Sequence, residues 1–218
     1  MARISHQQES NKSSNPTTKY LEWKSNDKSF SYYDKSKGEN VKVELPLKFV
    51  FLQHYHTVKG WSDASNSGIY SNEVYYIGSE PMAVKSFKGG LIAEGLYKEI
   101  KPAITNAGGK YHRSVYVMLE DGSLANISLK GAVVREWSTF MEDNANQCDV
   151  QWVEVNSAKE QKKGSVKYTT PEFTLGASIS KADASKADAV AEVFQEYIST
   201  YLKKKSEVEE EEVLDMGI

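Results

Sequence analysis

The chain has 218 residues, of which 39% are hydrophobic and 11% aromatic, and its net charge is −3. This length fits one domain with extensions or two small domains, and the apolar content is sufficient for a core. No run of about 18 apolar residues occurs, so no transmembrane helix is expected. The polar N-terminus lacks the apolar segment of a secretory signal. The lone cysteine, Cys148, excludes an internal disulfide and suits a reducing compartment, so we expect a cytoplasmic protein.

Acidic residues are concentrated at the C-terminus, where residues 206–218 hold six acids and no lysine or arginine. Without those six of the 30 acids, 24 acidic and 27 basic residues remain, so the rest of the chain has a net charge of +3. An acidic tail that ends in apolar residues can lie in the protein's own basic groove or dock partner proteins, although a merely solubilising tail remains an alternative. The residues expected to act in this tail are Glu207, Glu209, Glu210, Glu211, Glu212, Leu214, Asp215, Met216 and Ile218.

The first half of the chain reads as β structure behind a polar arm. Residues 1–18 are rich in Ser, Asn and Gln, which predicts a disordered arm. A turn over 34–40 joins a strand at 29–33 to a strand that starts at residue 41. Further strands are predicted, with a turn over 61–68, at 47–58, 69–77 and 82–87.

A helix interrupts this series of strands. Leu96, Ile100 and Ile104 recur at helical spacing after Leu91 and Ile92, and the pair Gly108-Gly109 ends the helix. Strands over 111–119 and 124–129 then form a hairpin around Asp121-Gly122. Three strands, a helix and two strands is the order of an OB-fold barrel, although other small barrels and α+β sheets share it.

The C-terminal part adds a short helix over 131–140, a hairpin of strands 150–155 and 164–173, and a helix over 187–202. The expected fold class is therefore mainly β with α (α+β): an OB-like five-stranded barrel with extra N-terminal and C-terminal strands and a C-terminal helix. One domain is expected over 19–205, followed by a disordered acidic tail over 206–218.

Enzymatic and metal-binding motifs are missing from the sequence. It contains no phosphate-binding glycine loop, no nucleophile elbow and no His-Glu-x-x-His. Cys148 lacks an activating cluster nearby in sequence. His54 and His56 share one face of a strand, but a tetrahedral site needs more ligands than His112 or an acid would supply. We therefore expect a binding protein without catalysis, cofactor or metal.

The most informative pattern is the interleaving of aromatic and basic residues. Tyrosine occurs 13 times and phenylalanine 7 times, and many tyrosines lie beside lysine or polar residues. Aromatic rings stack on bases while lysine and arginine follow phosphates, which is what a single-strand-binding groove requires. Strands also favour tyrosine and exposed lysine is common, so each single residue is a weak candidate. The candidates for stacking are Tyr32, Tyr33, Tyr55, Trp61, Tyr70, Tyr75 and Tyr116. The candidates for phosphate contact are Lys35, Lys37, Lys48, Lys85, Lys88, Lys110 and Arg113.

Three stretches, over residues 30–35, 95–100 and 127–132, are similar to single-stranded-DNA-binding proteins of tailed bacteriophages, including the crAss-like group. The resemblance covers about residues 20–205 and the tail. It implies an OB-type barrel, sequence-nonspecific binding of single-stranded DNA in replication, recombination and repair, a location in the host cytoplasm, and an acidic tail that autoinhibits and recruits replication proteins. Such tails often end in phenylalanine, whereas this one ends in Gly217-Ile218, which puts partner docking in doubt.

Two other classes of function remain open at the level of sequence. A virion structural or assembly protein would use the tyrosine-rich sheet as an interface between copies. A regulator would use the acidic tail as a DNA mimic without binding DNA itself. Whether the chain forms a homo-oligomer stays open as well.

Overall fold

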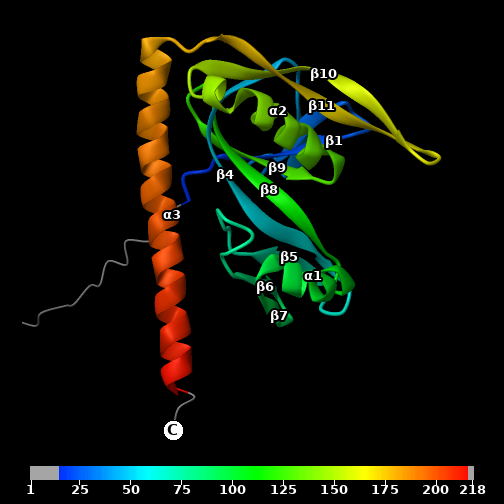
Figure 1. Cartoon of the computed structure of the whole chain (residues 1–218), viewed down its shortest axis with the longest axis vertical. Coiled ribbons are helices and arrows are strands. Elements are labelled where there is room, and N and C mark those ends of the chain that lie inside the picture. The colour runs from blue at the N-terminus through cyan, green and yellow to red at the C-terminus, as the bar shows by residue number, and fades with distance from the viewer. Residues whose placement is uncertain (1–14, 216–218) are drawn as a thin grey trace, which may run out of the picture.

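A computed structural model describes residues 15–215, with side chains described for residues 15–200. Over these residues the chain is mainly β with helices, an α+β fold (Figure 1). The strands are β1 (Lys19–Lys24), β2 (Ser29–Asp34), β3 (Glu39–Val43), β4 (Leu47–Ser62), β5 (Ser67–Ser71), β6 (Met82–Ser86), β7 (Gly90–Gly95), β8 (Gly109–Leu119), β9 (Leu124–Lys130), β10 (Gln151–Lys163) and β11 (Val166–Ser178). The helices are α1 (Tyr97–Asn106), α2 (Ala132–Cys148) and α3 (Lys181–Asp215).

The strands form one open mixed sheet in the order β3-β2-β1-β9-β8-β4-β5-β6-β7, and β10 pairs with both β11 and β4. The long strand β4 organises this sheet: it pairs with β10 near its start, with β8 along most of its length, and with β5 at its end. β1 and β9 are parallel, and the other paired strands are antiparallel. This arrangement does not confirm the expected OB-like barrel.

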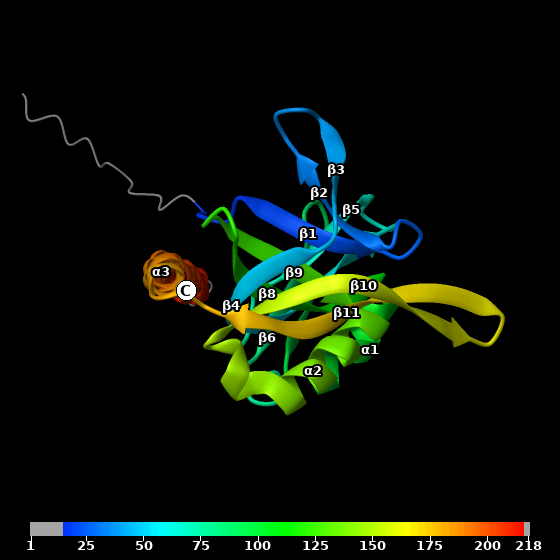
Figure 2. The same ribbon diagram turned by 90° about the horizontal axis from the view of Figure 1, so that it is seen from above.

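The two faces of β8 pack against different helices. Val115, Val117 and Leu119 belong to the main core together with Trp137 of α2. The alternating residue Tyr116 packs against Phe194 of α3. Because successive side chains of a strand point to opposite faces, α2 and α3 lie on opposite sides of β8. Figure 2 shows this separation, with α3 seen end-on to one side of the body and α1 and α2 away from it.

Several expected elements are confirmed and some differ. The β8–β9 hairpin forms as predicted, with Gly122 in its turn at a φ of 78°. β7 was missed: residues 90–95 pair with β6, because Gly90 adopts a φ of 72° and turns the chain back, so the helix starts only at Tyr97. α2 is longer than predicted and reaches Cys148.

The two predicted disordered ends fare differently. Residues 206–215 continue α3, since the glutamate-rich sequence contains good helix formers and no glycine or proline before Gly217. Residues 1–14 and 216–218 of the predicted arm and tail lie outside the described residues. The end of the arm joins the fold, because the backbone N–H and hydroxyl of Thr18 both donate to the Leu124 carbonyl at 2.9 Å.

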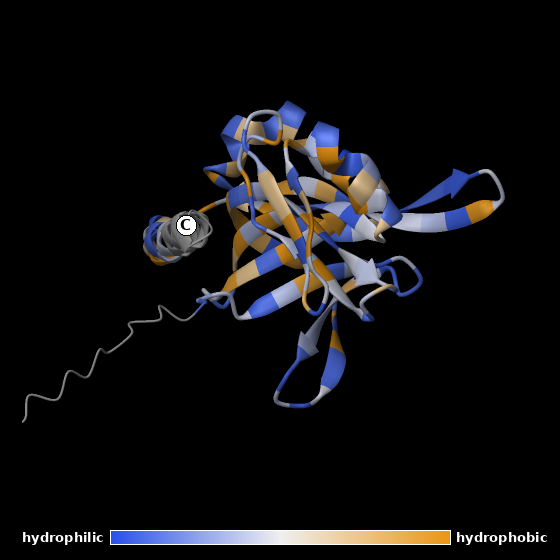
Figure 3. Cartoon of the chain, turned by 90° about the horizontal axis from the view of Figure 1, so that it is seen from below, coloured by the Kyte–Doolittle hydropathy of each residue, from blue (hydrophilic) through white to orange (hydrophobic). Residues whose placement is uncertain are grey.

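Hydrophobic residues gather in the central strands, while the outward turns of α2 are hydrophilic (Figure 3). The main core lies between the sheet and α2, with Phe30, Phe49 and Trp137 among its fully buried side chains. A smaller core lies between α1 and strands β4–β6, around Val58, Met82 and Ile104. Among the described residues, no helix is both long and apolar enough to cross a membrane.

Candidate nucleic-acid interface

Basic side chains line a cleft between α1 and α2. The cleft measures about 810 Å³ and contains Tyr97 and Tyr111. Among the described residues that line it, none is acidic. Its cations are Lys101, Lys110, Lys130 and Arg135. Because these charges come from α1, β8, the end of β9 and the first turn of α2, the packing of separate elements creates this positive surface.

The positive surface continues over the start of α2 to the β10–β11 hairpin. A second cleft, of about 760 Å³, shares Gly131 and Arg135 with the first and adds Lys162 and Lys163. Among the described residues, no side chain caps the N-terminus of α2. The free amide groups and the positive end of the helix dipole therefore add to the field of the cations.

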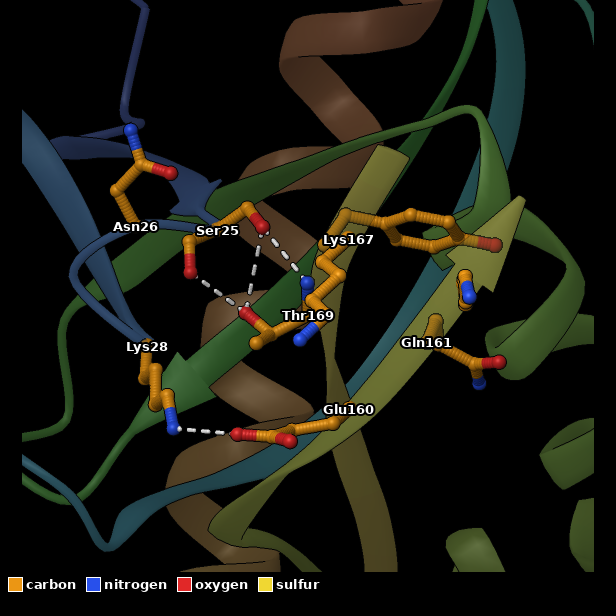
Figure 4. Close-up of a pocket in the computed structure, with 9 residues that line it drawn as sticks. Ser25, Asn26, Lys28, Glu160, Gln161, Lys167 and Thr169 are labelled. Atoms are coloured by element: carbon orange, nitrogen blue, oxygen red, sulfur yellow. Dashed lines mark hydrogen bonds and ion pairs between the residues drawn. The ribbon is translucent and has the colours of Figure 1, made fainter. Parts of the chain in front are cut away.

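A third cleft, of about 450 Å³, lies between the hairpin and the β1–β2 turn (Figure 4). It shares Lys162 and Tyr168 with the second cleft and adds Lys28 and Lys167. Glu160 is its acid, and its carboxylate accepts a hydrogen bond of 3.0 Å from Lys28, which lowers the pKa of Glu160. We call the three adjoining clefts the basic track. Its cations are Lys28, Lys101, Lys110, Lys130, Arg135, Lys162, Lys163 and Lys167.

Four of the sequence-predicted residues meet elsewhere, on the hairpins formed by β4–β6. Tyr70 stacks on Phe87 with ring centroids 4.6 Å apart. Trp61 pairs with Gly68, over which the Phe87 ring lies, so the three rings form one surface, here called the aromatic platform. Phe87 and Trp61 are 73% and 54% exposed. Lys85 pairs with Tyr70 and Lys88 follows Phe87, so both predicted lysines adjoin the platform.

Sequence reasoning missed Phe87 and most of the basic track. Phe87 directly precedes Lys88 and follows a strand, so the aromatic–basic pattern that selected other residues could have found it. Of the predicted phosphate contacts, only Lys110 lines the track. Arg113 lies behind it, where its guanidinium donates a long hydrogen bond of 3.4 Å to Ser138, a residue of the α1–α2 cleft. The other track cations lie in the β1–β2 turn, in α1 and α2, and at the ends of β9, β10 and β11, and no single strand pattern brings them together.

Tyr55 and Tyr116 are not available for base stacking in this structure, which corrects the prediction. They are only 8% and 6% exposed. The Tyr116 ring lies 4.1 Å from that of Phe194 in α3, and its hydroxyl donates to Glu73 at 2.8 Å. Burial raises the pKa of Tyr55 to about 12. Both residues face the apolar side of a long helix, whose burial stabilises the fold.

The remaining predicted residues are scattered. Tyr33, Lys35 and Lys37 lie at the β2–β3 hairpin, with Tyr33 exposed and Lys37 paired to Asp34 at 3.7 Å. Tyr32 packs partly on the main core. Lys48 and Tyr75 also interact with residues outside the track. Lys48 pairs with Glu154 at 3.3 Å, and Tyr75 makes an edge contact with Tyr55. None of these residues lines the described clefts of the basic track.

A buried polar cluster lies beside α3. Burial raises the pKa of the Glu73 carboxyl and lowers the pKa of the Lys59 ammonium group. Glu73 accepts a hydrogen bond from Tyr116, and Lys59 donates one of 3.1 Å to Ser128. These hydrogen bonds offset the cost of burying polar groups and help to hold the sheet together.

The described histidines and the cysteine all have pKa values shifted by burial. No group of three or more His, Cys, Asp or Glu within the described residues could hold a metal ion. Burial lowers the pKa of His54, His56 and His112 to about 4, so all three are neutral near pH 7. Cys148 is buried, and burial raises the pKa of its thiol to about 11. A thiol that stays protonated is a poor nucleophile.

Comparison with known proteins supplies no relative. The chain matches no protein-family model, no curated protein and no solved structure.

Proposed function

We propose that this chain is a binding protein without catalytic activity that holds single-stranded DNA with little sequence preference. The observation that carries the proposal is the basic track, in which eight cations and one acid line three adjoining clefts of the described structure. A row of lysine and arginine side chains attracts the phosphates of a nucleic acid, because binding releases the counterions of the strand. The basic track runs across several elements, so it suits an extended chain better than a small anion.

The aromatic platform supports a single strand over a duplex. Exposed rings such as Phe87 and Trp61 can stack on unpaired bases, which every base permits because each has a π-face. The platform adjoins the track at the turn before β8: the carbonyl of Trp61 lies against Gly108, and Lys110 of the track follows two residues later. One strand therefore reaches both surfaces, with bases on the platform and phosphates on the track.

The role in phage DNA replication, recombination and repair, the OB-like relationship of β4–β9 and the recruitment of replication proteins by the tail rest on the resemblance described above. The element order over β4–β9 keeps strands before α1 and the β8–β9 hairpin after it. The additional strand β7 departs from the expected order. Autoinhibition by the acidic segment is part of the same proposal.

The direct test is binding of a labelled oligothymidine strand, measured by fluorescence anisotropy over a range of salt concentrations. We expect binding that weakens as salt rises, and a weaker affinity for a duplex of the same length. The double reversal Lys130→Glu with Arg135→Glu is expected to weaken binding about 10- to 100-fold and to reduce the salt slope by about 1 to 1.5.

A matched control reverses two exposed lysines outside the track, Lys35→Glu with Lys181→Glu, and changes the net charge by the same amount. We expect at most a small loss of affinity from this control. An equal loss in both variants would show that net charge and not the track governs binding. Failure of the unaltered chain to bind at low salt would exclude the proposed function, and a large assembly formed without DNA would favour the virion class instead.

A further inference from the structure

A small recess opens where the clefts of the basic track meet. It measures about 170 Å³ and lies between the β1–β2 turn, the end of β9, the first turn of α2 and β11. It shares Lys130 with the α1–α2 cleft, Ala132 with the second cleft and Ser25 with the third. Tyr168 lines the recess and both clefts beside the hairpin, so we call the recess the Tyr168 pocket.

The walls of the Tyr168 pocket are mainly apolar, which distinguishes it from the track around it. Trp23, Leu129, Val133 and the ring of Tyr168 contribute these walls. Small-molecule sites combine apolar walls with a few polar groups, but most are larger than this recess. The pocket is therefore suited to a compact, flat group and not to a whole ligand of drug size.

Three residues at the edge of the pocket, Trp23, Ser25 and Thr169, are joined by hydrogen bonds. The Trp23 indole N–H donates to the Thr169 carbonyl at 2.9 Å. The Thr169 backbone N–H donates to the Ser25 hydroxyl, and the Thr169 hydroxyl donates to the Ser25 carbonyl, both at 2.7 Å. Figure 4 shows Thr169 and Ser25 joined in this way. These bonds fix the wall in place and leave few groups to distinguish one base from another.

We propose that the Tyr168 pocket receives one nucleobase of the bound strand while its neighbouring phosphates lie on Lys130 and Lys162. The inference rests on the proposed function and adds to it a site for a base on the track itself. Charge brings the strand to this junction, and the apolar walls then favour a base over water or a free anion. Because Trp23, Ser25 and Thr169 already hydrogen-bond to one another, selection is mainly by shape, in keeping with binding that tolerates any sequence.

The test compares an oligothymidine strand with an abasic strand of the same length and the same number of phosphates. Ala132→Phe places a ring at the mouth of the pocket from a half-buried position, and Tyr168→Ala removes one wall. In both variants we expect affinity for oligothymidine to fall about fivefold or more, the size of effect seen when stacking on one base is lost. Affinity for the abasic strand is expected to stay unchanged.

The control variant Ala189→Phe adds the same ring at an exposed position of α3 and is expected to change neither affinity. Circular dichroism spectra of all variants check that they fold. Equal losses for both strands, or no loss for oligothymidine in either folded variant, would overturn the proposal. If the unaltered chain binds neither strand, the proposed function fails and the pocket has no base to receive.

Discussion

The helix on one face of β8 is embedded in the molecule, whereas the helix on the other face is attached along a single side. α2 lies under the β10–β11 hairpin, and its Trp137 contacts the rings of Phe49, Phe140 and Phe173. α3 buries Ala187, Phe194 and Ile198 on the sheet and then continues to Asp215. Figure 1 shows the length of α3 beside the compact body.

The difference extends to charge. The start of α2 and the elements around it carry the basic track, while the sequence of the far half of α3 carries six acids between Glu207 and Asp215. The sign of the charge thus differs between the start of α2 and the end of α3. Packed elements hold the face that carries α2, as a preformed binding surface requires, whereas on the other face Tyr55 and Tyr116 pack against Phe194 of α3.

The largest expected effect concerns the packing of the two helices. Trp137→Ala removes the centre of the main core, and we expect it to lower the free energy of unfolding by about 3–5 kcal/mol. Phe194→Ala is expected to cost less, because its effect is limited to the free energy with which α3 docks on the sheet. Thermal unfolding measures the first effect, and hydrogen exchange of residues 187–200 measures local release of α3. Equal losses would mean that α3 is as integral to the core as α2.

Sequence reasoning captured the local elements and missed what depends on tertiary packing. The Asp121-Gly122 turn and the apolar face of residues 187–202 identified the β8–β9 hairpin and α3. The apolar face of α3 packs on Tyr55 and Tyr116 of the sheet. Nothing in the strand sequences distinguishes these two buried tyrosines from exposed ones such as Tyr33.

The candidate site was predicted in part for the same reason. Trp61, Tyr70 and Lys85 come together because neighbouring antiparallel strands place them on one face, which strand patterns can indicate. The basic track unites residues as distant in sequence as Lys28 and Lys162. Their approach depends on how the β10–β11 hairpin folds back over the β1–β2 turn, and single-sequence patterns do not specify that long-range contact.

Lowering the pH is the next test of the difference between the α2 face and the α3 face, because buried histidines lie on both faces of the sheet. His54 and His56 lie near Arg113, and His112 lies near Lys59 and Lys130. Their pKa values of about 4 in the folded chain are below the ordinary value of 6.5. Between these pH values the unfolded chain binds protons that the folded chain does not, so stability falls as pH drops from about 6.5 to about 4.

We therefore expect the melting temperature to decline by several degrees over this range, with its plateau above about pH 6.5. Replacing His112 by glutamine, and separately His54 by glutamine, should flatten the decline, so the pair of variants compares the α3 face with the α2 face. Glu73 acts with the opposite sign, since its raised pKa costs stability as pH rises. A melting temperature independent of pH over this range would contradict the assignment of buried neutral histidines.

The smallest expected effect comes from the acidic segment. A chain ending at Lys205 lacks all six acids of the tail and is expected to bind oligothymidine more tightly than the full chain. α3 packs on the face of β8 opposite to α2, so we expect its acids to act on the basic track through the general field and not by filling the clefts. Such an effect is screened over about 10 Å at 0.1 M salt. We therefore expect a gain in affinity below about tenfold at low salt that vanishes as salt is raised.

Replacing the same acids by glutamine in the full chain should reproduce the gain, because charge and not helix length causes it. A gain of a hundredfold or more that persists at high salt would show instead that the segment leaves the α3 face and competes directly for the track.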